Sequence, residues 1–218
     1  MRFDYQFLLR HLPGFAPGVA LALYLFASAA VVAMVCGLFL GLGRLSHRRL
    51  PFLASTAYVE FFRNTPSLIQ IYFVFFGLPL MGVRLSLFTS GVVALAAQHS
   101  AFFAEIYRGA VQGISINQIE GGTALGMRWR DVMVAVVLPQ AFRDAIPAIG
   151  NQLVLLLLDT SIVSTVGMME ITWTGLSLAE KSAASFESLV GVGAIYLVLS
   201  TIVSMIIRRL EHTHRVVR

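Results

Sequence analysis

The sequence predicts an all-α integral membrane protein with about five transmembrane helices. Of its 218 residues, 57% are hydrophobic and only 12% are charged, with a mean hydropathy of +0.80. A soluble domain carries roughly 25% charged residues. Several apolar runs reach the roughly 20 residues that cross a bilayer. Because lipid offers the backbone no hydrogen-bond partners, we expect these runs to be helices.

We expect these spans to form one transmembrane domain covering residues 1–218. The first, about 19–42, passes a signal-like Ala27-Ser28-Ala29 without interruption, and its length favours an uncleaved helix. The remaining spans are expected at about 61–80, 85–106, 132–166 and 189–207. Pro66 and Ile146 are alternative starts for the second and fourth spans.

Lysine and arginine are distributed unevenly over the expected loops. With the N-terminus outside, twelve of the 16 basic residues fall on the cytoplasmic side. The four on the outer side are Arg2, Arg10, Arg84 and Lys181. Because basic loops stay in the cytoplasm, we expect the N-terminus outside and the C-terminus and loop 108–131 inside. This topology explains the net charge of +5, so we expect no nucleic-acid partner.

Motifs for catalysis and metal binding are sparse. Lys181-Ser182 lacks the glycine of a phosphate loop, since Glu180 precedes the lysine. His99 and Ser100 are adjacent and point about 100° apart on a helix, so they form no hydrolase dyad with each other. The five histidines show no metal-ligand spacing with carboxylates or the single cysteine. We therefore predict that the chain is not an enzyme and holds no metal or cofactor.

The loop 108–131 contains the polar stretch QIEGGTALGMRWRD, residues 118–131. Overlapping capping boxes predict a helix that starts near Ile116, and Gly126 predicts its end. Gly121 and Gly122 each weaken such a helix by about 1 kcal/mol relative to alanine and allow another backbone to approach closely. The spacing alone leaves open a capped interfacial connector with solvated charges.

This stretch resembles the cytoplasmic coupling loop of ATP-binding cassette (ABC) importer permeases, whose pattern is Glu-Ala-Ala, a short spacer, Gly and, further on, an apolar-Leu-Pro. The matching residues are Glu120-Gly121-Gly122, Gly126 and Val137-Leu138-Pro139. Four further stretches resemble the polar amino-acid uptake permeases: EFFRNTPSLIQIYFVFFGLP (60–79), FFAEIYRGAVQGI (102–114), LPQAFRDAIPAIGNQ (138–152) and LDTSIVSTVG (158–167). The resemblance covers most of the chain and implies the type I importer permease fold.

The resemblance implies that the loop helix docks into a groove of a separate ATPase subunit, which binds ATP and Mg. The implied coupling residues are Glu120, Gly121, Gly122, Gly126 and Arg128. Lipid phosphates are the alternative partner for Arg128. Gly121 and Gly122 replace the usual alanines, and Leu158 stands where many members have a lysine.

The resemblance also implies an assembly in the bacterial cytoplasmic (inner) membrane. Its partners would be two ATP-binding subunits, a second permease copy or a sister permease, and a periplasmic or extracellular amino-acid-binding protein. The implied substrates are polar amino acids, with glutamate and aspartate as a guess within that class, moved by alternating access. The alternative is a stand-alone secondary carrier or channel, which would need its own coupling-ion site and no docking helix.

Polar residues inside the apolar runs are candidates for the substrate path. Asp159 lies about 20 Å along the helix from Ile146, and an ionisable residue at that depth is a functional candidate. We predict that Asp159 receives the α-ammonium group of the substrate and that Thr160 and Ser161 supply hydroxyls. A helix cap or an interhelical hydrogen bond is the alternative. Weaker candidates, which equally suit helix packing, are Gln70, Gln98, His99 and Ser100.

Two acid–base pairs are spaced i, i+3 near the expected cytoplasmic face. They are Glu60 with Arg63 and Glu105 with Arg108, for which we predict structural ion pairs. Three prolines are expected to kink or delimit helices: Pro66, Pro139 and Pro147.

Overall fold

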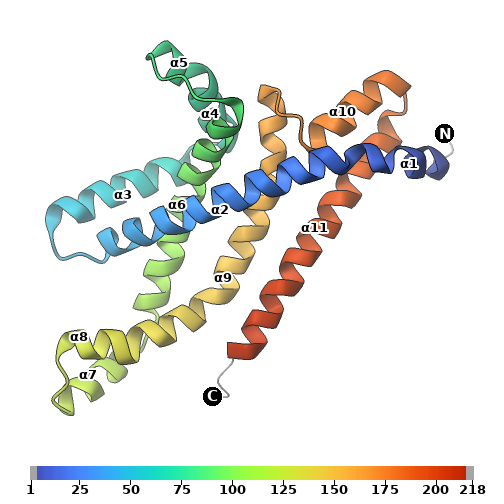
Figure 1. Ribbon diagram of the computed structural model, residues 1–218. Helices are drawn as coiled ribbons and strands as arrows, with labels where there is room; N and C mark the ends of the chain where they lie inside the picture. Colours follow the sequence, from blue (N-terminus) through green and yellow to red (C-terminus); the bar gives the residue numbers. More distant parts are fainter. Residues whose placement is uncertain (1–3, 215–218) are drawn as a thin grey trace.

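The computed structural model describes residues 4–214, with side chains through Glu211. All regular secondary structure in this part of the chain is helical (Figure 1). Arg2, Arg215 and Arg218, which entered the charge count above, lie outside the described residues.

Four segments of the described chain are long and apolar enough to cross a membrane: Tyr5–Arg44, Leu87–Gln112, Trp129–Val166 and Ser185–Glu211. The first begins well before the predicted residue 19, because α1 (Tyr5–His11) and a 3-10 turn η1 (Leu12–Phe15) lead directly into α2 (Ala16–Arg44). Polar residues in α1 hid this extension from a hydropathy argument.

The predicted span 61–80 is divided in the structure. α3 (Arg49–Asn64) ends before Pro66, and α4 (Ser67–Tyr72), a π-helical segment η2 (Phe73–Gly77) and α5 (Leu78–Leu80) follow. Proline forces the preceding residue out of the helical region, and Thr65 has φ −109° and ψ 141°. The apolar helix Ser67–Leu80 is shorter than the roughly 20 residues of a straight span. A fifth crossing therefore stays a prediction.

The remaining chain forms three long helical segments joined by short ones. The first is α6 (Leu87–Gln112). The region after it holds three short elements: α7 (Ile116–Ala124), α8 (Trp129–Val132) and the π-helical η3 (Met133–Val137). Then come α9 (Leu138–Asp159), a 3-10 turn η4 (Thr160–Val166), α10 (Ile171–Ser182) and α11 (Ser185–His214). Pro139 lies in the first turn of α9 and Pro147 lies inside it. Figure 1 places α7 and α8 at the end of the molecule opposite α5 and α10.

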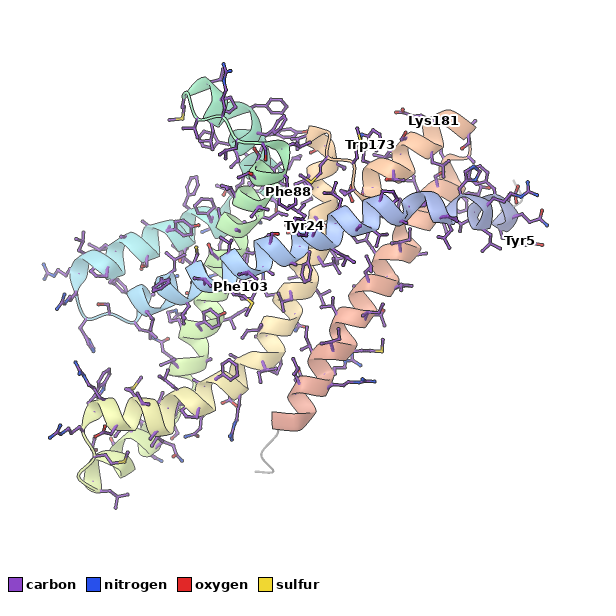
Figure 2. The ribbon with its side chains drawn as sticks, in the orientation of Figure 1. Tyr5, Tyr24, Phe88, Phe103, Trp173 and Lys181 are labelled. Atoms are coloured by element: carbon purple, nitrogen blue, oxygen red, sulfur yellow. The ribbon has the colours of Figure 1, made fainter. Side chains whose placement is uncertain are left out.

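α2 and α6 form the most extensive helix pair and carry the main apolar core. Leu25, Leu95 and Phe103 are fully buried in it. At the α10 end of the pair, Tyr24 stacks on Phe88 with ring centroids 5.2 Å apart (Figure 2). Further along, Gly37 lets the two backbones meet, since a Cβ there would lie 2.9 Å from the Ser100 carbonyl oxygen. Small residues at such crossings are typical of helix packing in membranes.

Candidate functional site

The helix in the predicted coupling loop begins at Ile116, as the capping pattern predicted. The Ser115 hydroxyl accepts a hydrogen bond from the Asn117 N–H at 3.3 Å. α7 ends at Ala124, and Gly126 then adopts φ +82°, a left-handed conformation that glycine reaches without strain. The Met127 N–H closes the end by donating to the Gly122 carbonyl at 3.2 Å.

The two glycines of α7 have different surroundings. Gly122 is buried against Val132, where a Cβ would lie 2.9 Å from a Val132 methyl carbon. A Cβ on Gly121 would meet nothing within 4 Å. The close neighbour of Gly122 is a side chain of the chain's own α8, so the approach of another backbone to either glycine stays a prediction.

The outer surface of this α7–α8 unit combines charged and apolar side chains. Glu120 and Arg128 are exposed, and so are Leu125 and Trp129, at 85% and 62%. Large exposed apolar side chains are costly in water and favour coverage by a partner or by the membrane surface. Of the predicted coupling residues, Glu120, Gly121, Gly126 and Arg128 are therefore exposed on this unit, whereas Gly122 is buried within it.

A second candidate region lies where α6 meets the end of α9. His99 of α6 is buried, and its Nε2 lies 3.2 Å from Oδ2 of Asp159, the last residue of α9. On the other side of the ring, the Gln152 amide donates to Nδ1 at 2.7 Å. The side chain of Asp159 is 31% exposed. Two predicted residues, Asp159 and His99, are thus brought together, and Gln152 joins them.

The hydroxyls next to Asp159 are arranged differently from the sequence-based expectation. Thr160 is fully buried, and its hydroxyl donates to the Leu157 carbonyl at 2.6 Å and lies 3.4 Å from the Tyr196 phenol. This hydroxyl is engaged within the protein. Ser161 is half-buried at the start of the 3-10 turn, beside Asp159. Contacts of either residue with substrate stay predictions.

The other path candidates make helix-packing contacts. Gln98 donates to the Ser67 hydroxyl at 2.7 Å, and the Ser100 hydroxyl lies within hydrogen-bond distance, 3.0 Å, of the Tyr58 phenol of α3. The Gln70 amide donates to the Phe62 and Thr65 carbonyls at 2.9 and 3.0 Å, where the break at Pro66 leaves carbonyl oxygens without helical partners. Each of these polar groups is occupied in joining helices, which is the alternative stated above for them.

Sequence reasoning missed a buried carboxylate after η4. Glu170 is fully buried and caps α10, accepting hydrogen bonds from the Thr172 and Trp173 N–H groups at 2.8 and 2.9 Å and from the Tyr196 phenol at 2.7 Å. Burial raises the pKa of Glu170, while the backbone and phenol donors act to lower it. Glutamate is not among the usual N-cap residues, so its position in a polar loop gave no signal.

Glu105 of α6 is the centre of a charged cluster with α2 and α3. Its oxygens lie 2.8 Å from Arg44, 2.9 Å from Arg108 and 3.5 Å from Arg63. The predicted Glu105–Arg108 pair is therefore present. The predicted Glu60–Arg63 pair is wrong: Arg63 turns to the more buried Glu105, which attracts several cations, and Glu60 lies 3.7 Å from Arg44.

Within the described residues, no group of three histidine, cysteine or acidic side chains is arranged to hold a metal ion.

Comparison with known proteins now identifies the chain. Residues 33–216 match the family described as binding-protein-dependent transport system inner membrane component. The chain belongs to this family. The permease is thus a multi-pass inner-membrane protein, and the resemblance to polar amino-acid uptake permeases is confirmed. Family membership implies ATPase and substrate-binding partners.

Relatives match this permease from end to end. It is 31% identical to the glutamine transport system permease protein GlnP of Escherichia coli (strain K12), over 99% of this chain and 100% of the relative. It is 32% identical to the arginine transport system permease protein ArtQ of Bacillus subtilis (strain 168), over 97% of each chain. A solved amino acid ABC transporter with histidines contains a chain that is 31% identical with a TM-score of 0.92, covering 98% of this permease and 100% of that chain. These matches confirm the ABC importer permease fold.

Proposed function

We propose that this permease imports polar amino acids by alternating access, driven by ATPase subunits that dock on α7 and α8. The observation that carries the proposal is the agreement between the family match and the two sites. Relatives that match over nearly the whole chain are named for glutamine and arginine transport. Asp159, the last residue of α9, is a partly exposed carboxylate within the membrane-length segment Trp129–Val166.

In this proposal Asp159 receives the α-ammonium group that amino acids share. An ionisable side chain at such a position is costly unless it has a partner or a function. The ammonium supplies charge-assisted hydrogen bonds, which are among the stronger polar contacts in proteins. The α-ammonium does not distinguish one amino acid from another. The sequence-based guess of glutamate and aspartate as substrates stays a prediction. It is tested by comparing the uptake of these two amino acids with that of glutamine and arginine.

The substrate site is tested with Asp159→Ala in the assembled transporter reconstituted in liposomes. We expect uptake of a labelled polar amino acid to fall at least about tenfold, because a hydrogen bond to a charged group is worth roughly 1.5–3 kcal/mol. Basal ATP hydrolysis should survive. Competition by unlabelled glutamine, arginine, glutamate and aspartate then ranks the substrates. Unchanged uptake by the variant would assign Asp159 a structural role.

The docking surface is tested with Glu120→Arg. This exposed residue on α7 can change charge without disturbing the fold, and we expect loss of co-purification with the ATPase or of substrate-stimulated ATP hydrolysis. Glu180→Arg is the matched control, since Glu180 is exposed on α10 at the other end of the molecule (Figure 1). Normal co-purification and normal coupled hydrolysis by Glu120→Arg would remove the assignment of Glu120 to the docking surface.

The proposed assembly contains two ATP-binding subunits, a second copy of this permease or a sister permease, and a binding protein on the outer side. The ATPases would bind ATP and Mg, and this chain would bind neither. Mass determination of the purified complex tests the stoichiometry and shows whether the two permeases are identical.

A further inference from the structure

His99 is held between two residues of the same face of α9. Gln152 and Asp159 are seven residues apart, which is nearly two full helical turns, so both side chains face α6. Gln152 contacts Nδ1 of the ring at 2.7 Å, and Asp159 contacts Nε2 at 3.2 Å. Both nitrogens of a buried imidazole are thereby occupied.

The identity of these contacts determines where the imidazole proton lies. The atom that faces Nδ1 is the amide nitrogen of Gln152, which only donates, so Nδ1 must accept. Nε2 then carries the proton and donates it to the Asp159 carboxylate. A doubly protonated ring would direct a second N–H at the Gln152 amide nitrogen and leave both donors unsatisfied. The two contacts thus match the neutral ring with its proton on Nε2.

A neutral His99 adds no positive charge next to the carboxylate of Asp159. The imidazole N–H engages one carboxylate oxygen without neutralising it, and the carboxylate remains partly exposed. From the other elements packed on α6, Tyr58 of α3 bonds the neighbouring Ser100 and Arg63 lies over the Phe102 ring, 5.5 Å from its centroid. The hydrogen-bond partner of Asp159 in the described structure is thus an uncharged ring.

We infer that His99 and Gln152 are positioning residues that determine the charge preference of the substrate site. They orient Asp159 and place an uncharged donor rather than a cation against its carboxylate, so the site favours zwitterionic and cationic amino acids over acidic ones. The inference rests on the proposed role of Asp159 in binding the α-ammonium group. It opposes the guess of glutamate and aspartate, because a substrate with a second carboxylate would face an unneutralised negative charge.

Two substitutions at His99 test whether its side chain acts on Asp159 as a neutral hydrogen-bond donor or as a cation. In His99→Gln the new amide can accept from Gln152 and donate to Asp159, as the neutral ring does. In His99→Lys a fixed positive charge lies against Asp159 and competes with the substrate ammonium. Both variants are compared with the unmodified chain in the reconstituted transporter, with membrane level and basal ATP hydrolysis as checks on folding.

The quantity compared is the concentration of unlabelled glutamine that halves the uptake of the labelled amino acid. For His99→Gln we expect this concentration to stay within about threefold of the value for the unmodified chain. His99→Lys should raise the concentration of glutamine needed at least about tenfold, since a charged hydrogen bond to the substrate is lost. It should also increase the acceptance of glutamate relative to glutamine. The reverse pattern, with His99→Lys normal and His99→Gln defective, would show that His99 acts as a cation and overturn the inference.

A spectroscopic measurement needs no transport and remains informative if His99→Lys does not fold. The purified full chain is labelled with ¹⁵N-histidine, and the His99 signals are found by comparison with His99→Gln. Near neutral pH we expect one protonated and one unprotonated ring nitrogen, with Asp159→Asn shifting chiefly the protonated one. Two protonated nitrogens would overturn the inference. Unchanged uptake by Asp159→Ala would instead remove the proposed role of Asp159 in binding substrate, and the protonation pattern of the His99 ring would stand independently of it.

Discussion

The phenol of Tyr196 donates a 2.7 Å hydrogen bond to Oε2 of Glu170, and this contact ties α11 to the first turn of α10. The same phenol lies 3.4 Å from the Thr160 hydroxyl, directly after Asp159. A series of polar contacts therefore connects the end of α9 with α10 and α11. Movement of α10 or α11 during transport would be transmitted to the backbone beside the proposed substrate carboxylate.

Glu170 should make the stability of the chain depend on pH. Burial raises its pKa, so the folded state favours the protonated carboxyl more than the unfolded state does. Its stabilising contribution is then fully present below the ordinary pKa of 4.5 and is lost as the pH rises through the raised value. We expect the thermal midpoint of the unmodified chain in detergent to fall across this range relative to Glu170→Gln.

Glu170→Ala separates the capping role of the carboxyl from its ionisation. Loss of the acceptor for two backbone N–H groups and a buried phenol should destabilise the chain by about 1–3 kcal/mol at every pH. If the difference between the unmodified chain and Glu170→Gln were constant from pH 4 to pH 9, the proposed ionisation of Glu170 would be wrong.

Glu105 should contribute much more to stability than Glu60. Glu105→Gln leaves Arg44, Arg63 and Arg108 close together without their shared carboxylate, and Glu105 is only 19% exposed. We expect a loss of about 2 kcal/mol in the free energy of unfolding, between the values for exposed and buried ion pairs. Glu60→Gln is the control, because its side chain is 55% exposed and should cost less than about 1 kcal/mol. Equal effects in denaturant titrations would contradict a central role for Glu105.

The sequence predicted the helices better than their boundaries. Long apolar runs require helices because lipid cannot satisfy the backbone, and this holds for all four membrane-length segments of the described chain. The break between Asn64 and Ser67 was hidden, because hydropathy sums over Pro66 while the backbone cannot pass it as a regular helix. The early start of the first segment was also hidden. α1 is helical although it contains polar residues, so a hydropathy argument did not include it.

The candidate sites were predictable only where the signal was local. The α7 helix follows from capping residues and a terminal glycine that are close in sequence. Asp159 was found because a carboxylate in an apolar run is costly. Gln152 could not be found in this way, because its partner His99 is 53 positions away and belongs to another helix. Pairing at such distances depends on tertiary packing, as does the shift of Arg63 from Glu60 to Glu105.

Gly37 should be essential for the packing of α2 on α6. A Cβ at this position would lie 2.6 Å from the Phe103 Cβ and 2.9 Å from a backbone oxygen, neither of which can move without displacing α6. We expect Gly37→Leu to destabilise the chain by about 3 kcal/mol or more through overpacking. Gly193→Leu on α11 is the control, since a Cβ there meets nothing within 4 Å. Similar thermal midpoints for the two variants would show that α2 and α6 are not closely packed.

Gly121 and Gly122 should respond in opposite ways to alanine, although they are adjacent on the coupling helix. Gly121→Ala adds a methyl group in open space and should stabilise α7 by about 1 kcal/mol through helix propensity. Gly122→Ala gains the same propensity but places its Cβ 2.9 Å from a Val132 methyl carbon, so α7 must move away from α8. We expect hydrogen exchange of the α7 amides to slow about fivefold in the first variant and to accelerate in the second. If a firmly held α7 transmits ATPase closure, substrate-stimulated ATP hydrolysis should be preserved by Gly121→Ala and reduced by Gly122→Ala. Slower exchange in both variants would mean that Val132 accommodates the methyl group. The two glycines would then act only by lowering the helix propensity of α7.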